Sequence, residues 1–315
     1  MIRLDSIGKS YGGVQAVDRV SLHIARGEFV LLIGASGSGK LTLLKMINRL
    51  VEFDRGTLTF DGADIRTLKP EDLRRRLGYA IQSTGLFPHW TVARNIATVP
   101  RLLGWPAART AARVDELLTL LNLDPATYRG RWPHQLSGGQ QQRVGVARAL
   151  AADPEVLLMD EPFGALDPPG RAAMQAEMAR IQQSTGKTIV MVTHDIDEAL
   201  RLATRIVLMD RGRIVQAGTP AQLLEQPASE FASDFFGRGE IGLKRLGLHG
   251  VAGILRGVEE TEGPPVSASL TQREALSMML LRRTDRLAVV GDDGRLLGTV
   301  LLRDLVLRGP DGRDG

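Results

Sequence analysis

The sequence predicts an α/β protein with a parallel sheet whose carboxyl edge binds a phosphate chain. Short apolar runs that suit buried strands recur along the chain, with helical segments between them. One such run, Phe29–Ile33, is followed by a glycine-rich turn and by a helix-like stretch, Leu43–Ile47. A strand, a glycine-rich turn and a helix N-terminus together cradle phosphates, because backbone N–H groups and the helix dipole favour anions.

Composition indicates a globular protein of one large or two ordinary domains. The 315 residues are 43% apolar and 24% charged, with a formal net charge of +4. This charge does not by itself indicate nucleic acid, and mild basicity also suits an anionic membrane surface. The lack of cysteine excludes disulfides and thiolate metal sites and favours the reducing cytosol. We expect neither a signal peptide nor a membrane-spanning segment, so another chain would anchor the protein at a membrane.

The first 150 residues predict strands followed by a helical region. Residues 1–28 alternate in character and suggest short strands, with turns at Gly12-Gly13 and Arg26-Gly27. Gly56–Phe60 predicts a further strand. The stretch from about Pro88 to Leu150 is mostly helical in pattern.

Three later runs predict buried parallel strands, because each is short and predominantly apolar. They are Val156–Met159, Thr188–Val192 and Arg205–Met209. Helices are expected between them, at Arg171–Gln183 and Ile196–Ala203. Ligands of such folds bind at the carboxyl ends of the strands.

The character of the chain changes near Gly237-Arg238-Gly239, and we expect a domain at 1–236, a glycine-punctuated linker at 237–262 and a small unit at 263–308. A core of about 50 residues is marginal, so the small unit should pair with something. Residues 309–315 predict a frayed tail. The small unit is expected to contain the following segments: helix Thr271–Leu281, strand Arg286–Val290, turn Gly291–Gly294, strand Leu296–Leu302 and helix Arg303–Leu307.

The glycine-rich turn lacks one expected group. It reads Gly34-Ala35-Ser36-Gly37-Ser38-Gly39-Lys40-Leu41-Thr42. The lysine of such a loop reaches the terminal phosphates, and the next residue should supply a hydroxyl to Mg²⁺. Here that residue is Leu41. Thr42 cannot simply replace it, because one helical residue rotates a side chain by ~100°.

Two further motifs carry chemistry. Asp160 and Glu161 end a predicted strand, where one carboxylate can hold Mg²⁺ and the next can polarise a water that attacks the γ-phosphate. Alone, the pair would equally suit a solvated strand end. In Ser137-Gly138-Gly139-Gln140 the glycines allow close approach to a ligand, and the helix that follows attracts phosphate. Alone, this motif would also suit an ordinary helix start.

In this order the motifs resemble those of the ATP-binding cassette (ABC) ATPases, over residues 1 to about 236. The resemblance implies a P-loop NTPase core with an antiparallel β subdomain and an α-helical subdomain at about 86–150. It assigns the motifs as follows: Walker A to Gly34–Thr42, the Q-loop to Gln82, the signature motif to Leu136–Gln140, Walker B to Val156–Asp160, the D-loop to Ala165–Asp167 and the switch histidine to His194.

The resemblance also implies a role for each motif. Glu161, His194 and Gln82 would be catalytic, and Gln82 and Asp160 would hold Mg²⁺. Tyr11 would stack on the adenine of ATP. The other residues implied to bind ATP are Gly34, Ala35, Ser36, Gly37, Ser38, Gly39, Lys40, Leu41, Thr42, Ser137, Gly138, Gly139, Gln140 and Asp167.

ABC ATPases form head-to-tail dimers in which each ATP lies between Walker A of one chain and the signature motif of the other. The resemblance therefore implies a homodimer, permease subunits in the membrane, a substrate-binding protein and a peripheral position on the cytoplasmic side of the inner membrane. Nucleic acid is not expected as a partner. ABC translation and DNA-repair factors typically need paired cassettes or long coiled-coil insertions, and neither is visible.

Two segments refine the class. Leu86–Val92 with Asn95-Ile96 resembles an importer ATPase, and Ala97–Trp105 resembles the quaternary-amine branch, which takes up glycine betaine, carnitine or choline. Arg94 departs from the glutamate common in relatives, so we expect different contacts with the permease at this position. The C-terminal unit resembles a single CBS domain, a module that works in pairs. Because Leu301 stands where nucleotide-binding relatives carry Ser or Thr, we expect dimerisation or an ionic-strength response rather than adenosine binding.

Leu41 leaves two main interpretations open. The chain is either a transport ATPase with weak Mg²⁺ binding and slow hydrolysis, or a nucleotide-gated regulatory module with little turnover. The presence of all the other catalytic motif residues favours the ATPase. A substitution introduced to trap one state, or a sequence error, would also account for Leu41.

Overall fold

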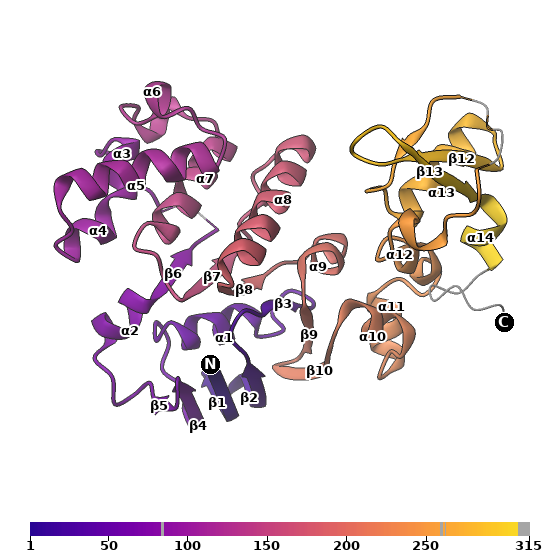
Figure 1. Ribbon diagram of the computed structural model, residues 1–315. Coiled ribbons are helices and arrows are strands. Elements are labelled where there is room, and N and C mark those ends of the chain that lie inside the picture. Colours follow the sequence, from indigo (N-terminus) through magenta and orange to yellow (C-terminus); the bar gives the residue numbers. More distant parts are fainter. Residues whose placement is uncertain (83–84, 259–260, 262, 308–315) are drawn as a thin grey trace. The chain divides into compact units, whose positions relative to one another are not determined.

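Residues Met1–Thr219 and Pro220–Gly315 form separate units in the structure, which is a computed structural model (Figure 1). The structure describes residues 1–82, 85–258, 261 and 263–307. The tail expected at 309–315 lies outside the described residues, as do Arg308 and a part of the linker expected at 237–262. Because the two units are separate bodies, each is described by itself.

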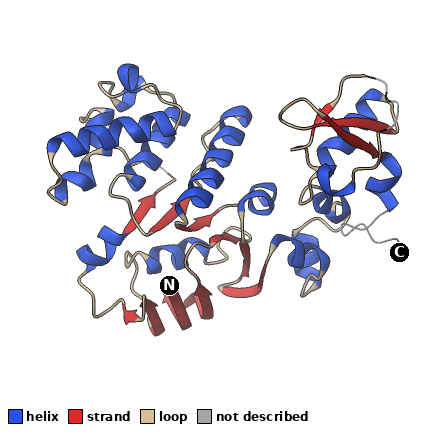
Figure 2. Cartoon of the chain, in the orientation of Figure 1, coloured by secondary structure: helices blue, strands red, loops and turns tan. Residues whose placement is uncertain are grey.

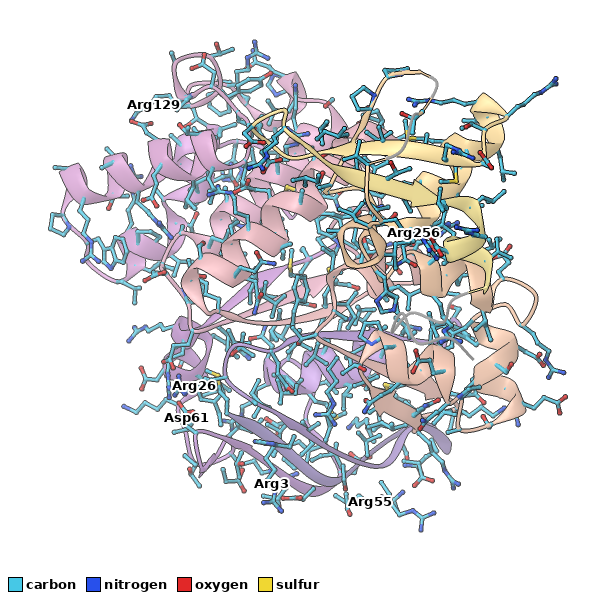
Figure 3. All side chains as sticks on the ribbon, turned by 45° about the vertical axis from the view of Figure 1, so that its right-hand side comes forward. Arg3, Arg26, Arg55, Asp61, Arg129 and Arg256 are labelled. Carbon is cyan, nitrogen blue, oxygen red and sulfur yellow. The ribbon has the colours of Figure 1, made fainter. Side chains whose placement is uncertain are left out.

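An antiparallel sheet opens the first unit, with strand order β2-β1-β4-β5. Gly12 and Gly13, which have φ values of 54° and 85°, turn the chain between two long strands instead of the short ones expected. At the rim of this sheet Arg26 Nη2 donates to Asp61 Oδ2 at 2.8 Å (Figure 3). The strands are β1 (Ile2–Tyr11), β2 (Val14–Ile24), β4 (Arg55–Phe60) and β5 (Ala63–Asp64).

The second sheet of this unit confirms the predicted parallel architecture. Its order is β10-β9-β3-β8-β7-β6, and every neighbouring pair is parallel except β10 with β9. Two of its strands, β6 and β10, were not expected from the sequence. The strands are β3 (Phe29–Ile33), β6 (Leu77–Ala80), β7 (Val156–Asp160), β8 (Thr188–Val192), β9 (Arg205–Asp210) and β10 (Arg213–Gly218).

Helix α1 (Lys40–Ile47) lies between the two sheets (Figure 1). Its residues Leu43 and Leu44 are completely buried in a core that also contains Leu4 and Leu58 of the first sheet and Val190 of the second. Removing this apolar surface from water, at about 25 cal/mol per Å², holds the helix against both sheets. The glycine-rich loop that precedes α1 is therefore anchored by a large apolar cluster.

The expected helical region consists of two longer helices, α5 (Ala107–Leu120) and α7 (Gly138–Leu150), and several short ones joined by loops (Figure 2). Asn95 is completely buried and orders the loop before its helix, because its side chain accepts from Phe87 N and donates to Phe87 O and Trp90 O. The helices of the unit after α1 are α2 (Pro70–Arg76), α3 (Val92–Ile96), α4 (Thr98–Leu102), α5 (Ala107–Leu120), α6 (Pro125–Tyr128), η1 (Pro133–Gln135), α7 (Gly138–Leu150), α8 (Pro168–Thr185) and α9 (Ile196–Leu202).

The second unit contains a three-stranded sheet of order β11-β12-β13. The stretch expected as a linker carries α12 (Ile241–Leu246) and η2 (Val251–Ile254), and the sequence-based domain limits stay predictions. Val251 and Ile254 belong to the core of this unit, together with Met279 and Val289. The other elements are α10 (Pro220–Glu225), α11 (Glu230–Phe235), β11 (Val266–Ser267), α13 (Gln272–Arg282), β12 (Arg286–Val290), β13 (Leu296–Leu301) and α14 (Leu302–Leu307).

Candidate active site

The loop between β3 and α1 has a backbone conformation that depends on glycine. Gly34, Gly37 and Gly39 have φ values of 146°, 76° and 97°. A Cβ on Gly34 would meet Met209 O and Ser38 Oγ, and a Cβ on Gly39 would meet Ala16 O. The positive φ disfavours side chains at all three positions, and at Gly34 and Gly39 the lack of space excludes them as well. The sequence therefore folds this loop as a bare backbone surface at the N-terminus of α1.

Lys40 is held inside this loop. Its Nζ donates to Gly34 O and Ala35 O, both at 2.7 Å, and lies 3.2 Å from Ser38 Oγ. Lys40 is 8% exposed, and burial lowers the pKa of its ammonium while nearby Glu161 opposes that shift. A nearly buried ammonium that only neutral oxygens satisfy is suited to an anion, because charged acceptors make the stronger hydrogen bonds.

Two consecutive carboxylates follow β7, as the sequence predicts. Asp160 is 8% exposed, and its pKa is raised chiefly by burial and further by Glu161, with Lys45 opposing the shift. Glu161 has a φ of 44°, and its N–H donates to Val192 O at 3.0 Å. A left-handed backbone at a residue other than glycine is strained. The turn at Glu161 aims the second carboxylate away from the direction of the strand.

Gln82 and His194 contact the two oxygens of the Glu161 carboxylate. Gln82 Nε2 donates to Oε2 at 2.9 Å, and His194 Nδ1 lies 3.1 Å from Oε1. Gln82 follows β6, and His194 follows β8. These three side chains therefore come together from the carboxyl ends of three strands of the parallel sheet.

One open cavity joins the phosphate loop to these carboxylates. It places Lys40 and the loop opposite Gln82, Asp160, Glu161 and His194. Leu41 also lines the cavity, is half-buried and packs against the apolar core between the two sheets. The remaining lining residues are Ala16, Gly34, Ser36, Gly37, Ser38, Gly39, Thr42 and Val192.

Several residues of the sequence prediction do not line this cavity. Tyr11 is 49% exposed at the end of β1, with Lys9 Nζ 5.3 Å from its ring centroid. Asp167 is exposed before α8. Ser137 caps α7 by accepting from Gln140 N, and Gln140 in turn accepts from Ser137 N. This signature segment, Ser137–Gln140, presents Ser137 and Gly138 to solvent and lies outside the cavity of its own chain.

Sequence reasoning missed residues that act through packing. Ala16 and Val192 line the cavity, and only Val192 had a signal, since it directly precedes the Thr193-His194-Asp195 motif. Gln142 on α7 is buried and bonded to the backbone of Glu161 and Ala165. Nothing in its local sequence indicates this pairing, because the contact joins segments that only the fold brings together.

Mg²⁺ is the metal that the motifs imply. Asp160 supplies a carboxylate, and because the amide nitrogen of Gln82 is bonded to Glu161, its amide oxygen is the atom available to a cation. Oxygen donors of this kind suit Mg²⁺. Leu41 adds no donor, and within the described residues no three His, Cys, Asp or Glu side chains are gathered so that they could hold a metal. The donor set is therefore incomplete at the Leu41 position.

None of the helices in the described part of the chain has the length and apolar character needed to cross a bilayer. Residues 17–164 match the ABC transporter family, and residues 260–310 match the CBS domain family. Residues Gly34 to Glu161 of the cavity lie inside the first match, while Val192 and His194 follow it.

The relatives extend these matches along the chain. The glycine betaine uptake system ATP-binding protein YehX of Escherichia coli (strain K12) is 55% identical, over 98% of this chain and 99% of the relative. The glycine betaine/carnitine/choline transport ATP-binding protein OpuCA of Bacillus subtilis (strain 168) is 47% identical, over 95% of this chain and 78% of the relative.

A solved structure agrees with this assignment. The dimeric structure of MJ0796, a bacterial ABC transporter cassette, has a TM-score of 0.65 and 33% identity, covering 70% of this chain and 99% of that chain. Family match, full-length relatives and cassette fold thus converge with the geometry of the cavity. The chain therefore belongs to the ABC transporter family as an ATPase of the kind coupled to transport, and its C-terminal part carries a CBS domain.

Proposed function

We propose that the chain energises an importer of a quaternary-amine osmoprotectant such as glycine betaine, carnitine or choline. The observation that carries the ATPase part is the convergence of Lys40, Gln82, Asp160, Glu161 and His194 on one cavity. The names of the two relatives, which specify these three solutes, support the solute class. The quaternary-amine resemblance of Ala97–Trp105 points the same way.

ATP would lie on the phosphate loop. Its phosphate oxygens would accept hydrogen bonds from the backbone N–H groups of Gly34–Gly39. They would also replace Gly34 O and Ala35 O as acceptors for the Lys40 ammonium, because a charged acceptor makes the stronger hydrogen bond. Thr42 would serve the α-phosphate, and the exposed ring of Tyr11 would stack on adenine. We assign the nucleotide-binding roles of the other loop residues on the same grounds.

Glu161 would act as the base in hydrolysis. A water oxygen forms a bond to the γ-phosphorus while the bond to the bridging oxygen of ADP breaks, and the water proton passes to Glu161. Gln82 and His194 hold the two carboxylate oxygens, so they fix the direction of the group that receives the proton. The Glu161 carboxylate would thus already be oriented when the water arrives.

Mg²⁺, when bound, neutralises charge on the phosphates. Asp160 and Gln82 would hold it, and the missing hydroxyl at Leu41 would weaken its binding. The loss of even an outer-shell group around a metal typically lowers affinity or activity by about 10–100-fold. We therefore propose that this chain binds ATP well and hydrolyses it slowly.

Leu41 also favours a second candidate function, a nucleotide-gated regulatory module with little turnover. In that case ATP binding and dimer closure would be the output of the chain, and hydrolysis would contribute little. The intact group of Gln82, Glu161 and His194 favours the ATPase. Measured turnover separates the two candidates.

The site would be completed by a second copy of the chain. The signature segment Ser137–Gln140 has no place in the cavity of its own chain, yet it places the exposed residues Ser137 and Gly138 at the N-terminus of α7, an end of a helix that favours anions. We propose that it binds the ATP of a partner copy, together with Asp167 of the D-loop. The further partners would be permease subunits, contacted through the segment around Arg94, and a substrate-binding protein, on the cytoplasmic side of the membrane.

The CBS domain would serve pairing of the two copies or a response to ionic strength. Leu301 is 6% exposed and offers no hydroxyl to a nucleotide. Its burial supports a packing role for this position. The domain would thus regulate the importer without binding adenosine.

An uptake assay tests the proposed function. The chain is co-expressed with the proposed permease and substrate-binding protein, reconstituted in vesicles, and assayed for ATP-dependent uptake of labelled glycine betaine, carnitine and choline. Uptake of one of them above the level of a Lys40→Ala variant is expected. Uptake that is equal with and without ATP, or ATP-driven uptake of none of the three, would refute the transport assignment.

A further inference from the structure

Gln142 is a buried side chain that joins two functional segments. It lies on α7, in the turn after the signature segment, and is 3% exposed. Its Nε2 donates to Glu161 O at 3.1 Å, and its Oε1 accepts from Ala165 N at 3.0 Å. The amide nitrogen of Gln142 thus bonds to the first residue of the segment Glu161–Ala165, and the amide oxygen bonds to its last residue. Such a paired contact fixes distance and orientation together.

The segment that Gln142 holds contains the strained turn at the base. Glu161 has a φ of 44°, and a residue in this conformation persists only where surrounding contacts determine it. The bond from Gln142 to the Glu161 carbonyl is such a contact, and the bond from Glu161 N to Val192 O is another. Changes at Gln142 should therefore reach the Glu161 carboxylate through its own backbone.

The signature glycines pack on the same segment. A Cβ on Gly139 would lie 2.8 Å from Leu166 Cδ2, and one on Gly138 would lie 3.9 Å from Ala165 Cβ. The first turn of α7 therefore touches the D-loop closely enough that a side chain on Gly139 would displace it. A shift of this turn should therefore be felt first at Ala165 and Leu166, because packed side chains transmit displacement.

We propose that Gln142 is a positioning residue that couples the two nucleotide sites of the dimer. The partner's ATP, bound at Ser137, fixes the position of the first turn of α7. Through its two hydrogen bonds, the Gln142 amide then fixes the backbone of Glu161 in the chain's own site. This inference rests on the proposed function, since it takes Glu161 as the base and Ser137 as a ligand of the partner's nucleotide. Coupling of this kind is a free energy between two sites and is measured as cooperativity.

A Gln142→Met variant tests the coupling, because methionine nearly conserves the volume and removes both hydrogen bonds. The matched control is Gln141→Met on the same helix. Gln141 Nε2 donates to Pro133 O and Leu136 O, which precede α7 and do not belong to the segment Glu161–Ala165. Single-turnover hydrolysis of radiolabelled ATP should fall about 100-fold in Gln142→Met, as for a displaced catalytic group. Its Hill coefficient should approach 1, and ATP binding to the monomer should be unchanged. The Gln141→Met control should keep its rate within about threefold and its cooperativity.

A conservative variant guards against a simple folding defect. In Gln142→Glu the introduced carboxyl is isosteric, and when protonated it can donate to Glu161 O and accept from Ala165 N as glutamine does. Burial favours the protonated form, so the ratio of variant to parent rate should rise as the pH falls from 8 to 6. The charged side chains near these segments are those of Glu161, Arg143 and Arg171, and both proteins contain them. A pH-independent ratio would overturn the proposal.

Hydrogen exchange separates failure of the coupling from failure of the proposed function. Addition of ATP should protect the amides of residues 161–166 in the parent and in Gln141→Met, but not in Gln142→Met. Equal protection in all three proteins overturns the coupling, whether or not the parent hydrolyses ATP. A parent that binds ATP without hydrolysis, while the protection still depends on Gln142, refutes the ATPase and supports the coupling.

Discussion

His194 Nδ1 lies 3.1 Å from Oε1 of Glu161, although the two residues follow different strands of the parallel sheet. The His194 side chain is 71% exposed, while that of Glu161 is 23% exposed. The histidine therefore covers one side of the carboxylate and still faces the open cavity. This relationship places an exposed polar group beside the proposed base, in the cavity that both residues line.

Glu161→Gln should abolish most hydrolysis and spare nucleotide binding. The amide keeps the shape and can still accept from Gln82 Nε2, but it cannot receive a proton from water. General-base catalysis contributes about 10²–10⁴-fold, so phosphate release should fall by that factor. Gel filtration should show an ATP-dependent dimer that persists longer than in the parent. Turnover within threefold of the parent would show that Glu161 is not the base.

Leu41→Ser should hydrolyse ATP faster and depend more steeply on Mg²⁺. The new hydroxyl completes the donor set, and a gain of about 10–100-fold matches the effect of one group on a metal site. The same change should lower the free energy of unfolding by about 1–2 kcal/mol, because half-buried Leu41 packs against the apolar core between the two sheets. Phosphate release at varied Mg²⁺ and thermal unfolding measure the two effects.

Leu41→Ala is the matched control for this change. Alanine removes the same packing and supplies no hydroxyl, so it should share the loss of stability and show no gain in turnover. A serine variant no faster than the alanine variant would show that the missing hydroxyl does not limit hydrolysis. ATP binding without Mg²⁺ should be alike in all three proteins, because the loop backbone and Lys40 are unchanged.

Asp160→Asn should stabilise the nucleotide-free chain at neutral pH. Burial, with Glu161 adding to it, raises the pKa of Asp160 in the folded state above its usual value of 3.8. As the pH rises through this range, the unfolded chain loses the Asp160 proton first, so folding is penalised and the penalty is complete above the folded pKa. The variant should have the higher Tm at pH 7, and the difference should vanish below the usual pKa of aspartate. Equal Tm values at pH 7 would contradict this account.

The predictable elements were those whose local pattern and tertiary environment agree. The strands at 29–33, 188–192 and 286–290 were predicted with the bounds that the structure has. Each is a short apolar run that contains β-branched residues between polar or glycine-rich flanks, so propensity and burial favour the same conformation. The phosphate loop was predictable for a similar reason, because its glycines, lysine and flanking elements adjoin in sequence.

Elements that depend on distant partners were missed. β6 reads Leu-Gly-Tyr-Ala and has no strand signal, yet it pairs in parallel with β7 from Leu77 to Ala80. Gly78 allows this, because a Cβ there would meet Ala149 O and Pro154. The role of Gln142 was hidden in the same way, since its partners at 161 and 165 lie on another segment. Pattern reasoning finds chemistry that is adjacent in sequence, whereas these contacts exist only after the sheet has assembled.

Arg256→Met should destabilise the second unit by about 2–4 kcal/mol. Arg256 donates from Nε and Nη2 to the two oxygens of Asp304, each at 2.6 Å, and Asp304 is 3% exposed. Removing the cation takes two hydrogen bonds and an opposite charge from a buried carboxylate, and breaking such a pair costs more than the pair itself contributes. Hydrogen exchange of β12 and β13 reports the loss. Exposed Arg295→Met is the control and should change stability by less than about 0.5 kcal/mol. Restoration by a second change, Asp304→Leu, would confirm the broken ion pair as the cause, and equal exchange in Arg256→Met and Arg295→Met would exclude it.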